Sequence, residues 1–338
     1  MPRNPHNKIV GQGEYQYIID AHWVSAHLDI ENAHDFAIDK NGIVLMVTDH
    51  PTRAVIEFSS DGEVLKEWGY FPGAHGIEIS QENGEEFIYI VDSGWIINPD
   101  WDGISTDAWD SPYNKVVPQS GSIWKLTRMG RIVWTLGHPQ TLGLYQPEMP
   151  FNPTDIAITS DGDLYVTDGY GSDFVLHLSR DGQVKSMWGG HNNEDPNHNI
   201  HNAHGITFDG RGDVPRLIIS SRSEQELKCY TLDGNYLSSI TTPGAYIHAP
   251  VIADFGMVAA VCWTGSKAAP EENSGVVCVF DNSDELVSVL GGTNAHQIHS
   301  DGETFHHCHG IAVQQNGDIL VAQWRGEHTM PFKLSKAK

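Results

Sequence analysis

The chain has 338 residues, is 39% hydrophobic and carries a formal net charge of −24. The hydrophobic content is sufficient for a sizeable core. The acidic balance argues against nucleic acid or an anionic membrane surface as a partner, because both favour basic patches. No apolar run approaches the length of a membrane span, and the polar start of the chain does not resemble a signal peptide. We therefore expect a cytoplasmic protein that binds neither nucleic acid nor a membrane, and the sequence leaves its oligomeric state open.

Short strands with alternating apolar residues recur along the chain from the N-terminus onward. Residues 15–20 read as an outer strand that has no blade of its own. The third repeat is the clearest copy, with strands expected over 155–159, 164–167, 175–178 and 184–188 and a turn at Asp181-Gly182. β-Branched and aromatic residues fill these strands, and no helical periodicity of comparable length competes with them.

The repeats begin near residues 33, 74, 153, 203, 247 and 308. Four-stranded units that recur at intervals of about 40–50 residues are typical of a β-propeller. The last unit lacks one outer strand after 332–334. The N-terminal strand can supply it, and such closure hides the sheet edges. The sequence thus predicts an all-β fold: a six-bladed β-propeller of four-stranded blades in a single domain over 1–338, closed by an N-terminal strand.

Three longer segments interrupt this rhythm. The insertion at 94–120 carries Trp95, Trp101 and Trp109, which either form a wall of a substrate pocket or pack the insertion. Segments 191–202 and 293–307 are rich in histidine. Their histidines could form a lid or a second metal cluster, although solvated loop histidines are the ordinary case: His191, His198, His201, His296, His299, His306 and His307.

Histidine recurs at one register of the repeat openings. Ala-His-Asp, Ala-His-Gly and Cys-His-Gly are examples, and only the third repeat has Pro-Thr-Asp instead; the five histidines are His34, His75, His204, His248 and His309. First strands line the channel of a propeller, so these side chains are expected to ring one mouth of it. A single histidine at a strand start usually only packs or hydrogen-bonds, but five in six repeats favour a bound metal.

Alternate blades of a six-bladed ring lie about 120° apart, which places His75, His204 and His309 as a three-histidine site with an open position. Neutral imidazoles of this kind suit a divalent transition metal. His34 and His248 are further candidates, as additional ligands, acid/base groups or supporting groups. Second-strand ends open on the same face and bring neighbours to the ring: Asp49-His50, Asp92, Asp168 with Tyr170, Ser221-Arg222, Trp263 and Trp324-Arg325.

The cysteines Cys229, Cys262, Cys278 and Cys308 show no C-x-x-C spacing. Three of them lie in apolar strand-like runs, which is typical of buried free thiols. Nothing in their spacing requires a disulfide.

These openings resemble NHL-repeat propellers and, more narrowly, the peptidyl-α-hydroxyglycine α-amidating lyases. The resemblance covers about residues 33–336 and implies zinc on His75, His204 and His309. Val166-Thr167-Asp168-Gly169-Tyr170 matches the motif that supplies the family's catalytic tyrosine, so Tyr170 takes that role, and Arg222 matches an active-site arginine.

The chain departs from that family at two places. The family's first-blade arginine falls near Asp49-His50 here, which leaves His50 and Arg53 as substitutes. The family also has an aspartate after its last zinc histidine that helps to bind a structural Ca²⁺, where this chain has Gly310. These differences bear on the substrate more than on the metal.

The sequence therefore favours a metal-dependent lyase that cleaves the C–N bond of a carbinolamide or another small polar substrate. One alternative is a metal-dependent hydrolase or lactonase on the same scaffold, with metal-activated water as the nucleophile. Another is a non-enzymatic NHL interaction module, since fold alone does not decide function.

Overall fold

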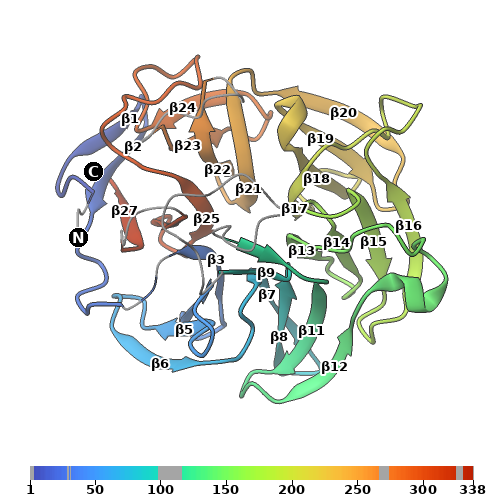
Figure 1. The fold of residues 1–338 in the computed structure, drawn as a ribbon. Coiled ribbons are helices and arrows are strands. Elements are labelled where there is room, and N and C mark those ends of the chain that lie inside the picture. Colours follow the sequence, from blue (N-terminus) through green and yellow to red (C-terminus); the bar gives the residue numbers. More distant parts are fainter. Residues whose placement is uncertain are drawn as a thin grey trace.

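The computed structural model describes residues 4–28, 30, 32–97, 116–265, 274–324 and 330–337. Six antiparallel sheets surround a central channel, and the first strand of each sheet lies nearest the axis (Figure 1). In this part of the chain the helices are two short 3₁₀ turns, η1 (Pro139–Leu142) and η2 (Arg222–Glu224). The predicted six-bladed β-propeller is confirmed.

Each of the first three blades contributes four strands in sequence order. They are β3 (Ala33–Ile38), β4 (Val44–Thr48), β5 (Val55–Phe58) and β6 (Val64–Trp68) in blade 1; β7 (Ala74–Glu82), β8 (Glu85–Asp92), β11 (Ser122–Thr127) and β12 (Ile132–Leu136) in blade 2; and β13 (Asp155–Ile158), β14 (Leu164–Thr167), β15 (Phe174–Leu178) and β16 (Val184–Gly189) in blade 3. The insertion in blade 2 begins and ends in a small hairpin of β9 (Trp95–Ile97) and β10 (Val116–Pro118). Trp101 and Trp109 lie outside the described residues.

Blades 4 and 5 repeat the pattern, and blade 6 completes the ring. The strands are β17 (Ala203–Asp209), β18 (Arg216–Ser221), β19 (Glu226–Thr231) and β20 (Tyr236–Thr241); β21 (Ala245–Ala253), β22 (Gly256–Thr264), β23 (Val276–Phe280) and β24 (Leu286–Leu290); then β25 (Cys308–Val313), β26 (Ile319–Gln323) and β27 (Phe332–Lys336). Tight turns join the outer strands, and the Asp-Gly turns hold Gly62 and Gly182 at φ of +86° and +80°, which suits glycine.

The N-terminal strand closes the ring as predicted. β2 (Tyr15–Asp20) pairs antiparallel with β27, so that Asp20 lies opposite Lys333 and Ile18 opposite Ser335. A further strand, β1 (Ile9–Gln12), adds a fifth member to this sheet and was not predicted. Gln12 hydrogen-bonds Val289 of β24, so β1 also joins blade 6 to blade 5.

The core consists of six apolar clusters, one at each interface between neighbouring blades. Strand β4 shows how one strand serves two of them: Val44 and Met46 pack toward blade 6, while Leu45 and Val47 pack toward blade 2. All five residues of β4 are therefore buried. Cysteines Cys229, Cys262, Cys278 and Cys308 are free and buried, and no helix in the described part of the chain could span a membrane.

Candidate functional site

Each of the five predicted histidines lies at an irregularity in its first strand. In β3 and β7 the pairing skips His34 and His75, and β17, β21 and β25 shift register at His204, His248 and His309. Such β-bulges turn a side chain away from the regular alternation of a strand. In blade 3 the pairing of β13 runs without a shift, and the residue at this register is Thr154.

The bulges bring the five imidazoles together at the axis. All five side chains are buried. The ring centroid of His75 lies 4.7 Å from that of His309 and 4.8 Å from that of His204. The ring centroids of His204 and His309 are 5.2 Å apart. The five rings, with Asp35 and Asp155, line a cavity of about 10 Å³, which is room for about one water-sized atom.

Hydrogen bonding divides the five histidines into two sets. Nδ1 of His75 contacts the carbonyl oxygen of Thr154 at 2.7 Å, Nδ1 of His204 that of His248 at 3.1 Å, and Nδ1 of His309 that of His34 at 2.9 Å. A carbonyl only accepts, so each of these Nδ1 atoms carries the proton and each Nε2 keeps its lone pair. We call His75, His204 and His309 the anchored histidines. Nδ1 of His34 and of His248 is buried and has no hydrogen-bond partner among the described residues.

The anchoring alternates around the ring. Blades 2, 4 and 6 carry the anchored histidines, and blades 3, 5 and 1 supply the carbonyl groups. The anchored histidines are each followed by glycine. A Cβ on Gly205 would lie 2.1 Å from the His248 carbonyl oxygen, and one on Gly310 would lie 2.2 Å from that of His34. Glycine therefore allows the neighbouring backbone to approach closely enough to accept the Nδ1 hydrogen bond.

Burial sets the protonation of the ring. It lowers the pKa of His75, His204, His248 and His309 well below 6.5. Neighbouring imidazoles act in the same direction on all four, and Arg222 does so on all but His309. These imidazoles are therefore neutral near pH 7, which is the form that binds metal. Donor atoms of two sets lie within 4.8 Å of one another, His34 with His75 and His309, and His204 with His248 and His309.

Tyr170 lies against the anchored histidines, as the sequence predicted. Its hydroxyl is 2.9 Å from Nε2 of His204 and 3.2 Å from Nε2 of His75. Trp95, at the start of the insertion, stacks on the Tyr170 ring with centroids 4.0 Å apart and planes 8° apart. Burial raises the pKa of Tyr170, while Arg222 opposes that rise. Trp95 is thus part of the wall of the site.

Asp168 holds the loop that presents Tyr170. Its buried carboxyl group accepts hydrogen bonds from the backbone N–H groups of Asn152 and Ser172 and from the Tyr145 hydroxyl. Burial raises the Asp168 pKa to about 8. The Asn152 side chain donates to the carbonyl groups of Ser93 and Gln119, at the two ends of the insertion. One network therefore positions both Tyr170 and the hairpin that carries Trp95.

Arg222 begins η2, directly after β18. Its Nη1 donates to Nε2 of His248 at 2.8 Å, and its guanidinium lies 5.7 Å from the Tyr170 ring and 5.4 Å from the Trp263 ring. His50 and Arg53 instead contact each other on blade 1, with 2.8 Å between Nη2 and Nε2, and Arg53 also lies 3.8 Å from Glu67. Asp49, beside them, is 3.9 Å from His34. Arg325 lies outside the described residues.

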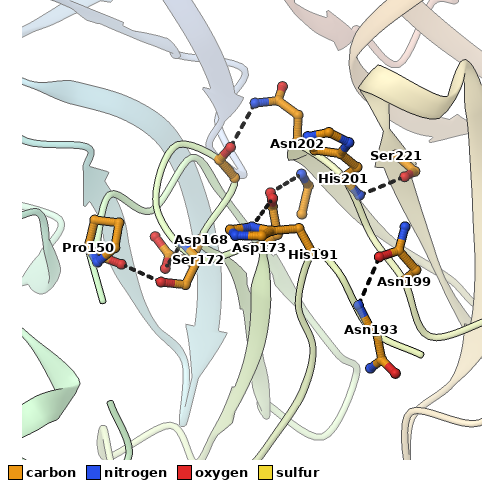
Figure 2. Close-up of polar contacts among 12 residues, drawn as sticks. Pro150, Asp168, Ser172, Asp173, His191, Asn193, Asn199, His201, Asn202 and Ser221 are labelled. Atoms are coloured by element: carbon orange, nitrogen blue, oxygen red, sulfur yellow. Dashed lines mark hydrogen bonds and ion pairs between the residues drawn. The ribbon is translucent and has the colours of Figure 1, made fainter. Parts of the chain in front are cut away.

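The segment between blades 3 and 4 is tied to the site by Asp173 and Asn202 (Figure 2). Asp173 accepts from the backbone N–H of Ala203 and contacts His191 Nδ1, both at 2.8 Å. The Asn202 side chain donates to the carbonyl oxygen of Gly169, next to Tyr170. His191 is therefore held by the Asp173 carboxylate.

A layer of carboxyl groups lines the channel below the histidines. Asp35 and Asp155 accept backbone hydrogen bonds from Ile77 and Ile206 of the next histidine-bearing blades. Burial, and for Asp35 also the charge of Asp155, raises the pKa of both, that of Asp155 to about 7. These two carboxyl groups therefore link the inner strands of neighbouring blades. The structural Ca²⁺ that the family resemblance implies stays a prediction.

Several features of the site could not be read from the residue pattern. The Thr154 carbonyl, the Asn152 side chain and the Cys262 thiol, which lies near His248, carry no motif. One feature of the sequence does distinguish the two sets of histidines. Each anchored histidine is followed by glycine, whereas His34 is followed by Asp35 and His248 by Ala249.

No known protein-family profile matches the chain. Human NHL repeat-containing protein 3 is 24% identical over 194 residues, which make up 55% of this chain and 47% of that protein. The chain thus matches about half the length of this curated relative. The repeats and this match fit an NHL-repeat propeller, as predicted, whereas the likeness to amidating lyases stays a prediction.

Solved structures with the same fold include enzymes. The chain is similar to a putative gluconolactonase (TM-score 0.58, 11% identity, 98% of this chain and 97% of that one). It is similar to a gluconolactonase from Xanthomonas campestris (TM-score 0.57, 12% identity, 100% and 98%). It is also similar to a streptogramin B lyase (TM-score 0.52, 13% identity, 92% and 96%). At such identities the likeness is one of fold.

Proposed function

We propose that this chain is a metal-dependent lyase that acts on a small, polar, anionic substrate at the histidine-ringed mouth of the channel. The observation that carries the proposal is the shared orientation of the anchored histidines. Their Nδ1 atoms are occupied by carbonyl groups of the intervening blades. Metal-binding histidines are typically oriented in this way, with one ring nitrogen held and the other left to the ion.

The residues present fit a divalent transition metal. Three neutral, buried imidazoles keep an Nε2 lone pair beside a cavity of about one atom's size. Zn²⁺ on His75, His204 and His309 would supply Lewis-acid polarisation of a substrate oxygen. A site with three protein ligands keeps an open position for that oxygen.

Tyr170 and Arg222 then divide the remaining work. Arg222 binds a substrate carboxylate through its guanidinium. Tyr170, as phenolate, takes the proton of the substrate hydroxyl; the C–N bond breaks as the C=O bond forms, and the proton passes to the leaving amide nitrogen. Burial alone raises the pKa of Tyr170, so this role requires the nearby cations to favour the phenolate.

Metal analysis of untagged protein, purified without added metal, tests the proposal first. At least about one equivalent of transition metal is expected, and the His75→Ala/His204→Ala double variant should bind about one equivalent less. Loaded protein is then assayed on carbinolamides and on lactones. Metal-free protein that also resists reconstitution would leave the non-enzymatic interaction module as the better account.

A second assay separates Tyr170 from the metal ligands. Tyr170→Phe should lower kcat by about 100-fold or more, the usual contribution of acid–base catalysis, while metal content stays unchanged. Unchanged kcat would remove Tyr170 from the mechanism. The hydrolase alternative is supported by the shared fold with gluconolactonases. Oxygen from labelled water in the product would favour that alternative over the lyase.

A further inference from the structure

A second set of donor atoms lies beside the histidine ring. Cys262, His248 and His307 place one nitrogen or sulfur atom each within 4.8 Å of the others. His248 and Cys262 come from the first two strands of blade 5, and His307 comes from the end of the segment that precedes blade 6. The three residues thus converge from two strands and one loop.

The Cys262 thiol is brought into this set by an irregularity of its own. In blade 5, Tyr246 pairs with Trp263 and the next residue, Ile247, pairs with Val261, so the pairing skips Cys262. The thiol is fully buried and donates to the Tyr246 carbonyl oxygen at 2.9 Å. A bulge that re-aims one side chain at an active-site edge is a common functional device.

His248 has no place among the anchored histidines. The residue is 2% exposed, and its Nδ1 has no hydrogen-bond partner in the part of the chain that the structure describes. A buried N–H group without a hydrogen-bond partner is energetically costly, so a ligand that binds this nitrogen removes a cost. The ring centroids of Trp263 and Trp324 each lie 5.3 Å from that of His307, so both tryptophans pack against this histidine.

We propose that Cys262, His248 and His307 form a second transition-metal site, next to the ion held by the anchored histidines. One thiolate and two imidazoles suit Zn²⁺ and related borderline ions. Binding replaces the thiol proton by the ion and releases that proton to solvent. The site goes beyond the proposed function, which needs only the anchored set.

Occupation of this site changes the position of Arg222. Nε2 of His248 now accepts from Arg222 at 2.8 Å. If the ion binds Nε2, the contact is displaced; if it binds Nδ1, the proton moves to Nε2, which can then no longer accept. In both cases the guanidinium leaves His248. It then becomes available to a substrate anion.

Cobalt spectroscopy tests the second site independently of any reaction. Metal-stripped, untagged full-length protein is titrated with Co²⁺ under a phosphine reductant, and its near-ultraviolet absorption is recorded. A thiolate ligand produces an intense charge-transfer band, whereas a site made only of imidazoles produces none. We expect about two equivalents of Co²⁺, the band in wild type, and its loss in Cys262→Ser.

Matched variants fix the assignment. Cys278→Ser replaces another fully buried thiol, on β23, and should keep the band. His307 occupies a half-buried loop position, so His307→Ala should leave the fold intact. The Co²⁺ affinity measured from the growth of the band should fall by about 100-fold. His75→Ala/His204→Ala should lose one equivalent and keep the band.

The outcomes separate the two sites. Bound Co²⁺ without a charge-transfer band in wild type overturns the second site and leaves the proposed function standing. A band that survives in Cys262→Ser, or that disappears equally in Cys278→Ser, also overturns it. A band that persists in a double variant lacking any other bound metal supports the second site alone.

Discussion

Blades 2, 4 and 6 and blades 1, 3 and 5 have different tasks at the channel mouth. The first set opens with His-Gly and presents an imidazole; the second opens with His-Asp, Thr-Asp and His-Ala and presents a carbonyl group to it. Glycine in the first set admits the neighbouring backbone. The residue that follows the histidine therefore decides whether the imidazole is held by a carbonyl group of the next blade.

The same comparison continues one step down the channel. Blades 1 and 3 follow their opening residue with Asp35 and Asp155, which bind the backbone of blades 2 and 4. An aspartate side chain therefore hydrogen-bonds across the boundary between blades 1 and 2, and another does so between blades 3 and 4. Blade 5 has Ala249 at this position, and it is also the blade that contributes His248 and Cys262 to the second set of donor atoms.

The largest expected effect is on Zn²⁺ affinity, which should fall far more when an anchored histidine is replaced than when His34 is replaced. His309→Ala should weaken Zn²⁺ binding on the order of 1000-fold, because it removes one of three ligands. His34→Ala should weaken it by about tenfold or less, since the His34 carbonyl that anchors His309 belongs to the backbone and remains. Competition titration with a zinc chelator measures both variants. Equal losses would erase the distinction between the two sets of blades.

A steric change at the following glycine should have the next largest effect. Gly205→Ala places a methyl group 2.1 Å from the His248 carbonyl oxygen, and such overpacking should lower the free energy of unfolding by about 3 kcal/mol. Gly137→Ala is the matched control, since its Cβ would meet no atom of the described residues within 4 Å. Urea denaturation of both variants gives the comparison. An equally stable Gly205→Ala protein would show that close approach of the blades is not needed.

The pH dependence should be smaller and of opposite sign for the two kinds of group. Because the pKa of His204 is lowered in the folded protein, its imidazole binds a proton below about pH 6.5 in the unfolded chain but stays neutral in the folded one. This contribution to stability is present above pH 6.5 and is lost as the pH falls, by at most about 1.4 kcal/mol per pH unit for each such histidine. Asp155, with its pKa raised to about 7, contributes stability at low pH that is lost as the pH rises from about 4 toward 7.

Asp155→Asn isolates the second contribution. The amide still has an oxygen that can accept from Ile206, but it does not titrate. The stability of metal-free protein, measured between pH 5 and 7 with a chelator present, should therefore rise more steeply with pH in the variant than in wild type. A shallower rise would contradict the sign derived for Asp155.

Much of this site could be predicted because it depends on a repeated register. The period of the openings placed His34, His75, His204, His248 and His309 on one face, and the turn residues fixed the strands between them. The N-terminal strand over 15–20 followed from the short last repeat, and the structure confirms it.

The remainder depends on contacts between segments far apart in the chain. The stacking of Trp95 on Tyr170 requires the insertion to fold back over the third blade. Cys262 reads as an ordinary buried strand residue, and only the register shift against Tyr246 brings it to His248. Such shifts reflect the pairing of two strands, and the residues themselves carry no mark of them.

Anomalous diffraction at the zinc edge, from crystals of untagged protein loaded with Zn²⁺, would locate the ion among the histidines. We expect an anomalous peak bonded to Nε2 of His75, His204 and His309, with their Nδ1 atoms still hydrogen-bonded to the three carbonyl groups. A peak instead on His34 with His75 and His309, or on His204 with His248 and His309, would contradict this expectation. In that case orientation by the intervening blades would not select the ligands.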